Sequence, residues 1–190
     1  DQASRNTADF PNVACAQADL LALPLADASF DFVYSLGVLH HLKETERALA
    51  GLVSKLKPGG RLRIYLYWKK HGLAGRLLAL VTISRRVTTR MPFALLRAFC
   101  WILSVGVFGA LVVPYRILSR LGVHWHESWP LAVYRKYPFT VLYNDQFDRF
   151  SAPLEKRYDP DEVRALLRDA GLTAIEVRPC MGWIADGIKP

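Results

Sequence analysis

The sequence predicts an α/β fold built on a strand, a helix and a second strand, and three observations indicate it. Two runs of β-branched and aromatic residues, at 30–35 and 61–67, have the composition of strands. Between them apolar residues recur at helical spacing: Ala48, Leu49, Leu52, Val53 and Leu56. Pro58-Gly59-Gly60 cannot continue a helix, so we expect a turn there. Such a unit lies in a mostly parallel sheet with a right-handed crossover.

Polar residues gather at the ends of the expected strands, where α/β sheets bind ligands. This rule places a site at Asp19-Leu20, at residues 35–41 and at Tyr67-Trp68. A further strand is expected at residues 13–18, directly before Asp19. Two simpler interpretations stay open: Asp19 as a turn residue at a strand end, and Gly37 as a turn glycine.

Five short motifs, in order, resemble the class I S-adenosylmethionine-dependent methyltransferases. They are Ala18-Asp19-Leu20 with Leu23-Pro24, Ser29-Phe30-Asp31-Phe32-Val33, Gly37-Val38-Leu39-His40-His41, Leu56-Lys57-Pro58-Gly59-Gly60, and the strand leading into Tyr65. Each motif is weak alone, whereas five at the family's spacing are specific. The resemblance covers residues 6–68 closely and residues 153–190 more loosely. It implies a Rossmann-like sheet with a mostly helical insertion after the fifth strand.

The resemblance also implies roles for individual residues. S-adenosyl-L-methionine is the expected cofactor, with Asp19 holding its adenine amino group, the Leu20 amide meeting the ring, and Ser35, Leu36 and Gly37 facing its methionine part. His40 and His41 follow the strand at which the family places the methyl donor, so one of them is the expected base or acceptor-orienting group. Capping of the next helix, or hydrogen bonding to backbone groups, is the alternative for both. Tyr67 and Trp68 are expected to border the acceptor.

Two family features have no counterpart in the sequence: the glycine-rich loop after the first strand and the acid that grips the ribose. Residues 1–6 resemble the tail of the helix that follows the second strand. We therefore expect the sheet to be incomplete at its amino terminus.

Composition sets wider limits on the kind of protein. A chain of 190 residues, 52% of them hydrophobic, can fill a core and is not disordered. Three widely spaced cysteines, at positions 15, 100 and 180, fit reduced thiols and a cytoplasmic location. His124 and His126 could share one strand face, yet no third ligand follows nearby, and we expect no metal site.

An apolar and basic insertion is expected at residues 69–152, between a partial methyltransferase core at 1–68 and a closing segment at 153–190. Residues 69–136 hold eleven Lys or Arg and one acid, Glu127, which gives a net charge of +10. This asymmetry suggests an anionic partner, although a solvated helix face would account for it equally well. Nucleic acid is not expected, because the aromatic residues lie in apolar runs rather than between the basic ones.

Residues 98–113 are sixteen residues without a charge, and they allow three interpretations. A buried core helix leads, because a membrane span needs about twenty residues. Peripheral contact with an anionic membrane comes second, since Arg85, Arg86, Arg90 and Arg97 lie just upstream. A true span comes last, because a longer apolar run would place Arg97 in the bilayer at about 2.5–3.5 kcal/mol.

The carboxy-terminal region closes the expected core. Asp159-Pro160-Asp161-Glu162 has the pattern of a helix start and Gly171 that of its stop, with strands expected at 173–178 and 182–188. Just before it, Tyr143 and Asp145 combine aromatic and polar character and are candidate substrate contacts. The expected function is methyl transfer to a small or lipid-like acceptor. The alternative is a non-catalytic, membrane-associated or interaction protein on the same scaffold.

Overall fold

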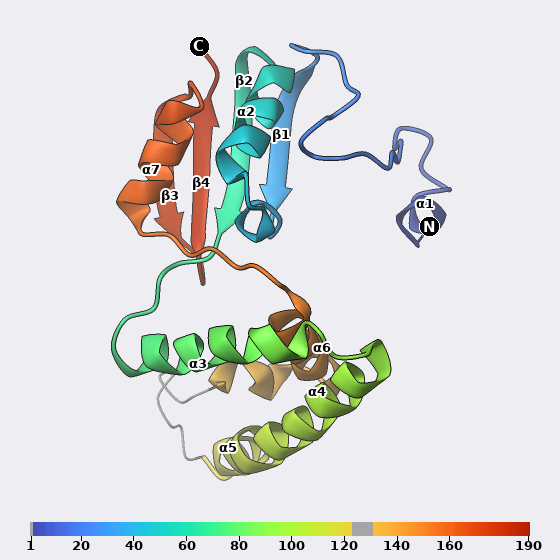
Figure 1. Ribbon diagram of the computed structural model, residues 1–190, viewed down its shortest axis with the longest axis vertical. Coiled ribbons are helices and arrows are strands. Elements are labelled where there is room, and N and C mark those ends of the chain that lie inside the picture. The colour runs from blue at the N-terminus through green and yellow to red at the C-terminus, as the bar shows by residue number, and fades with distance from the viewer. Residues whose placement is uncertain (1, 123–130) are drawn as a thin grey trace. The chain divides into compact units, whose positions relative to one another are not determined.

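The structure, a computed structural model, describes residues 2–122 and 131–190, apart from the side chains of residues 73, 74 and 77. Its chain divides into two compact units (Figure 1). The first unit combines Asp1–Lys69 with Lys156–Pro190, and the second is Lys70–Glu155. Each unit is described by itself below.

The first unit is built on a mixed four-stranded sheet with the order β1-β2-β4-β3. β1 (Phe30–Leu36) and β2 (Leu56–Leu66) pair in parallel. β4 (Trp183–Ile188) runs antiparallel to both β2 and β3 (Thr173–Pro179). The predicted α/β fold, with its βαβ unit and closing antiparallel hairpin, is confirmed.

Helices α2 (Thr45–Lys55) and α7 (Pro160–Asp169) enclose the core of this unit. The apolar side of α2 is buried as its spacing predicted, and Leu62, Ile64 and Leu66 of β2 meet it with no exposed surface. The start of α7 is the predicted one: Asp159 and Glu162 form a reciprocal capping box, which satisfies backbone donors at the helix start. Short helices α1 (Gln2–Asn6) and η1 (Leu39–His41) complete the unit.

Two expectations about strands are corrected. Residues 13–18 are exposed and form no strand. A strand is stabilised by pairing, and no strand of the described sheet lies beside this segment. Pro58-Gly59-Gly60 does not separate α2 from a strand that starts at Arg61: β2 already begins at Leu56, and the extra residues form an irregularity opposite Phe30 and Phe32. Gly59, at φ +77°, supplies the left-handed backbone that this irregularity needs.

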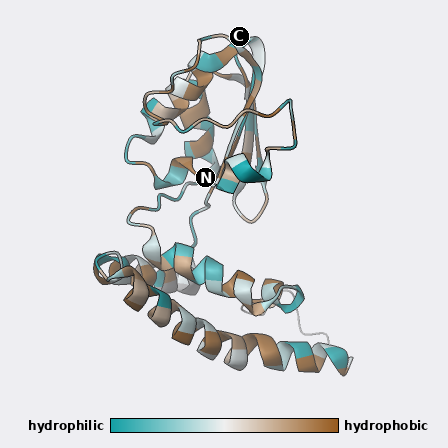
Figure 2. Ribbon diagram, turned by 90° about the vertical axis from the view of Figure 1, so that its right-hand side faces the viewer, coloured by the Kyte–Doolittle hydropathy of each residue, from teal (hydrophilic) through white to brown (hydrophobic). Residues whose placement is uncertain are grey.

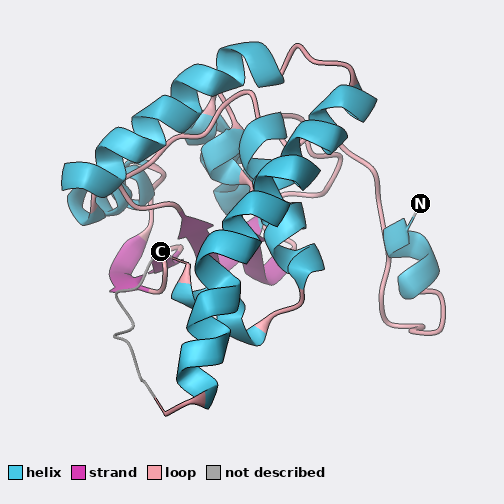
Figure 3. Ribbon diagram, turned by 90° about the horizontal axis from the view of Figure 1, so that it is seen from below, coloured by secondary structure: helices cyan, strands magenta, loops and turns pink. Residues whose placement is uncertain are grey.

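The second unit is helical, and the magenta strands of Figure 3 all belong to the first. It contains α3 (Gly72–Thr88), α4 (Phe93–Val107), η2 (Phe108–Val112), α5 (Val113–Arg120), η3 (Ala132–Lys136) and α6 (Phe139–Ser151). α4, η2 and α5 form one continuous helix of 28 residues, Phe93–Arg120. The wider π turn of η2 directly precedes Pro114, which has no backbone N–H to donate.

This long helix does not have the buried core position that was the leading interpretation. It is long and apolar enough to cross a membrane by length and composition, yet only 22% of its most apolar window is buried. One stripe, which includes Leu96, Cys100 and Val112, packs in two small clusters with residues of α6. Much of the rest of its surface is apolar and exposed, although Arg97 and Arg120 are exposed on it as well.

Arg85, one of the residues expected to meet lipid headgroups, is buried instead. Its guanidinium donates to the carboxylate of Glu155 at 2.6 Å and to the carbonyl of Arg149 at 2.7 Å. A guanidinium with these partners ties α3 to the end of α6 and cannot reach a membrane.

Candidate functional site

The carboxyl ends of the parallel strands bring the predicted histidines against Tyr67. β1 is followed by η1, which carries His40 and His41, and β2 is followed by Tyr67. The ring centroids of His40 and Tyr67 are 4.0 Å apart, and those of His40 and His41 are 4.3 Å apart. His40 is fully buried, whereas His41 is partly exposed. His41 is therefore the imidazole that an acceptor can reach.

The segment 156–158, which is distant in the sequence, holds this cluster in place through hydrogen bonds. The backbone N–H of Lys156 donates to the carbonyl of His40 at 2.8 Å, and that of Tyr158 donates to the carbonyl of Tyr67 at 2.9 Å. The side chain of Lys156 also donates to Thr45 at 3.1 Å and to the carbonyl of Lys43 at 2.7 Å. These bonds hold η1, the start of α2 and the end of β2 together.

Arg157 adds a positive charge to the cluster. Its guanidinium lies 5.1 Å from the centroid of the Tyr67 ring and donates to the carbonyl of Trp68 at 3.2 Å. Nearby, burial raises the pKa of Tyr65, and Tyr67 and Cys180 raise it further while Arg157 opposes them. The Tyr65 hydroxyl, protonated at neutral pH, donates to the carbonyl of Met181 at 3.2 Å. The site thus combines packed imidazole and phenol rings with the positive charges of Lys156 and Arg157.

The residues expected to face the methionine part of the cofactor lie at the end of β1. Ser35 is buried on the helix-covered side of the sheet, and Leu36, the last strand residue, is 53% exposed. Gly37 follows with φ +79°, and a Cβ built there would meet nothing within 4 Å. The backbone at Gly37 is therefore open to a ligand.

Asp19 and Leu20 lie in a turn beside α2. One carboxylate oxygen of Asp19 accepts the backbone N–H of Leu21 at 2.9 Å, and the side chain is exposed. Leu20 packs on the core, and its carbonyl oxygen lies 3.9 Å from the position that a Cβ at Gly51 of α2 would occupy. Across the described residues, no hydrogen bond or ring contact links Asp19 to the histidines. Asp19 therefore stabilises the turn through one carboxylate oxygen, and its other carboxylate oxygen can accept a hydrogen bond from a ligand.

The remaining candidates have other surroundings. Trp68 packs edge to face on Trp183 at 6.0 Å. Tyr143 and Asp145 belong to α6 in the second unit: Tyr143 stacks on Phe139, and Asp145 accepts the Tyr134 hydroxyl at 2.6 Å. Each of these two residues has a partner within its own unit, and their role as substrate contacts stays a prediction.

Sequence reasoning missed Lys156, Arg157 and Thr45. Their partners are as far as 113 residues away along the chain, so no local pattern marks them. The one available signal was the acidic helix start at Asp159, which places the preceding residues at the edge of the sheet. His124 and His126 lie outside the described residues, and within residues 2–122 and 131–190 no three metal-binding side chains cluster.

The described residues fit S-adenosylmethionine at the positions expected for it. An exposed carboxylate with one uncommitted oxygen suits the exocyclic amino group of an adenine, and the neighbouring amide offers a donor. The open backbone at Gly37 lies one residue beyond the strand end. These features are the ones on which the family resemblance depends.

Part of the chain is similar in sequence to known methyltransferases. Residues 1–64 match the family described as methyltransferase domain. An uncharacterized protein from Synechococcus is 31% identical over 172 residues, which is 88% of this chain and 36% of that protein. Phosphoethanolamine N-methyltransferase 2 of Caenorhabditis elegans is 37% identical over 54 residues, 28% of this chain and 12% of that enzyme. The chain thus spans well under half the length of these relatives.

A solved structure shows the same fold. It is the complex of the Haloferax volcanii Trm112 methyltransferase activator with a protein described as a methyltransferase, at a TM-score of 0.53 and 14% identity, covering 100% of this chain and 67% of that one. The family match over residues 1–64 and the shared fold support a class I S-adenosylmethionine-dependent methyltransferase domain in the first unit. S-adenosylmethionine is the cofactor of this class.

Proposed function

We propose that the protein transfers the methyl group of S-adenosylmethionine to a small or lipid-like acceptor, with His41 as the base or acceptor-orienting group. The observation that carries this proposal is the cluster of packed rings of His40, His41 and Tyr67 at the carboxyl ends of the two parallel strands. In an α/β sheet this edge is where a ligand binds.

The bound cofactor would supply a methyl group on a positively charged sulfur. Asp19 and the Leu20 amide would hold its adenine, and Ser35, Leu36 and the open backbone at Gly37 would border its methionine part. An in-line displacement requires mainly alignment of the acceptor and exclusion of water. Buried His40 would position His41, Tyr67 and Trp68 would border the acceptor, and His41 would take a proton where the acceptor must lose one.

A lipid-like acceptor is supported by the second unit, which exposes apolar side chains and contains eleven Lys or Arg, although Arg85 is buried. We include reversible contact with an anionic membrane in the proposal on this ground. The cytoplasmic location stays a prediction. The non-catalytic alternative is not favoured by the domain match or by the histidine cluster.

Label transfer tests the proposal. Full-length protein would be incubated with S-adenosylmethionine carrying a labelled methyl group, together with either a lipid extract or a water-soluble extract of cells. We expect label in one fraction, which also assigns the acceptor class. Binding of S-adenosylhomocysteine without label transfer to either fraction would contradict catalysis and favour the scaffold alternative.

A further inference from the structure

The long helix of the second unit exposes an apolar stripe along most of its length. Large apolar residues recur on its open face: Leu95, Trp101, Ile102, Val105, Val113 and Ile117 are between 37% and 66% exposed. The chain has no charged residue from 98 to 115. Figure 2 shows this helix in brown for most of its course. Water-soluble proteins seldom expose so continuous an apolar surface.

The opposite stripe of the same helix argues against a span. It packs on α6, which is polar on its outer side and exposes Asp145 and Asp148. A bilayer that surrounded the long helix would have to take in these carboxylates as well. The arrangement suits a helix that lies in a membrane surface with one side down.

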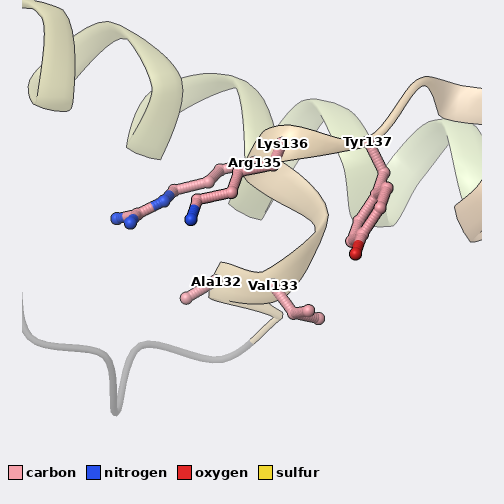
Figure 4. A pocket seen from close by; sticks show the side chains of 5 residues that line it. All are labelled: Ala132, Val133, Arg135, Lys136 and Tyr137. Carbon is pink, nitrogen blue, oxygen red and sulfur yellow. The ribbon is translucent and has the colours of Figure 1, made fainter.

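A cationic pocket lies at the carboxyl end of the stripe. Two adjoining cavities of about 300 and 400 Å³ share Arg135, Lys136 and Tyr137, and the larger one is also lined by Arg116 and Arg120. Figure 4 shows the side chains of Arg135 and Lys136 extending in the same direction. Four positive groups thus meet in a space large enough for a phosphate ester.

Hydrogen bonds orient the charges of this pocket, and no carboxylate among residues 2–122 and 131–190 neutralises them. Arg116 donates to the carbonyls of Tyr134 and Arg135 at 3.2 and 3.0 Å, and Arg135 donates to the Tyr115 hydroxyl at 2.7 Å. Carbonyl and hydroxyl oxygens fix a guanidinium but carry no formal charge. In the part of the chain that is described, no carboxylate forms a salt bridge with Arg116, Arg120, Arg135 or Lys136. The pocket therefore favours an anion.

The stripe and the pocket form one surface. On α5, Val113, Ile117 and Arg120 follow one another at spacings of four and three residues, which places them on one face. Exposed Val133 and Tyr137 lie at the pocket itself. An anion in the pocket would have apolar residues beside it, as a phosphate beside acyl chains requires.

We propose that this surface docks on an anionic membrane, with the cationic pocket holding the phosphate of a lipid headgroup and the apolar stripe entering the outer hydrocarbon. The proposal deepens the membrane contact named above, yet it does not depend on methyl transfer. It can therefore be tested without cofactor or acceptor, and its failure would leave the proposed reaction standing.

The first test compares vesicles by co-sedimentation. We expect the full-length protein to bind phosphatidylcholine vesicles that contain phosphatidylglycerol at least about tenfold more tightly than pure phosphatidylcholine, with partial loss in high salt. Glycerol 3-phosphate, which has the phosphate without the chains, should compete only weakly. Equal binding to both vesicles, or no binding at low salt, would overturn the proposal. Tight binding of glycerol 3-phosphate without vesicle binding would assign the pocket to a soluble phosphate instead.

The second test separates pocket from stripe. R120E with K136E should lower binding to anionic vesicles about tenfold or more, because two exposed charges are reversed. The matched control is R5E with R168E, an equal charge change on exposed residues of the first unit. I102S with V105S should remove the binding that survives high salt. All six positions are exposed, so circular dichroism and thermal unfolding should be unchanged. If the control and pocket variants lost vesicle binding equally, net charge alone would explain the loss, and the proposed headgroup pocket would be contradicted.

Discussion

At the scale of single residues, burial separates the two histidines of the site. His40 has no exposed surface and its ring packs against that of Tyr67, whereas His41 beside it is partly exposed. An imidazole acts on an acceptor only where the acceptor can approach it. The two residues, which the sequence treats alike, therefore have different roles in this account.

Replacement of His41 by Asn should lower turnover by about 10²–10⁴-fold and leave cofactor affinity nearly unchanged, because a base acts on the acceptor in the transition state. Replacement of His40 by Asn should lower turnover and also thermal stability, because its ring fills a buried position. Single-turnover rates with labelled methyl donor and the acceptor found by label transfer measure both effects. His71→Asn, at an exposed histidine outside the cluster, is the control. Wild-type turnover in both site variants would leave these histidines a structural role only.

At the scale of elements, a charged network crosses three strands on the open side of the sheet. Asp186 of β4 accepts from Arg63 of β2 at 2.8 Å and from Arg178 of β3 at 2.7 Å. Burial alone would raise the pKa of this carboxyl, but the two guanidiniums outweigh burial and lower it. A lowered pKa means that folding favours the ionised form.

The stability that Asp186 contributes should therefore be fully present at pH values above the pKa of this carboxyl in the unfolded chain, which is about 4. It should be lost as the pH falls through the lower pKa of the folded protein. Asp186→Asn should cost about 1–2 kcal/mol at neutral pH, less than a fully buried pair because both arginines are partly exposed. Urea unfolding between neutral and acid pH measures this. Asp9→Asn, in an exposed loop, is the control. A variant that lost as much stability on acidification as the wild type would exclude this network as the cause.

Elements with strong local signals were predictable, and elements that depend on distant partners were not. The residues that form the buried stripe of α2 and the capping box of α7 lie close together in the sequence, since these helices have eleven and ten residues. Residues 13–18 have strand composition but no neighbouring strand in the described sheet, so pairing and not propensity decides their state. In the site, the strand-end rule placed His40 near Tyr67, whereas the contacts of Lys156 depend on a chain crossing that no local pattern encodes.

The long helix shows a further limit of sequence reasoning. Its charge-free run allows a core, a surface or a span, because composition does not say which face has a partner. The structure supplies the missing fact: α6 covers one stripe and leaves the other open.

At the scale of the whole molecule, the two units contain different kinds of functional surface. The first holds the segment that matches the methyltransferase domain family and the histidine cluster, and the second holds the exposed apolar stripe and the cationic pocket. The second unit has eleven basic and four acidic residues, the first fourteen and thirteen. Because the net positive charge is concentrated in the second unit, we expect that mutations can change the proposed membrane docking and the proposed reaction separately.

Calorimetric titration of the full-length protein with S-adenosylhomocysteine tests the central claim most directly. We predict binding, weakened by about 1.5–3 kcal/mol in Asp19→Ala, because a charged acceptor of a hydrogen bond is lost. Asp19→Asn retains an oxygen for the Leu21 N–H and so separates the turn from the cofactor contact, and Asp9→Ala serves as the control. Equal affinity in the wild type and both Asp19 variants would remove Asp19 from the site, and no binding by the wild-type protein would contradict the assignment as a methyltransferase.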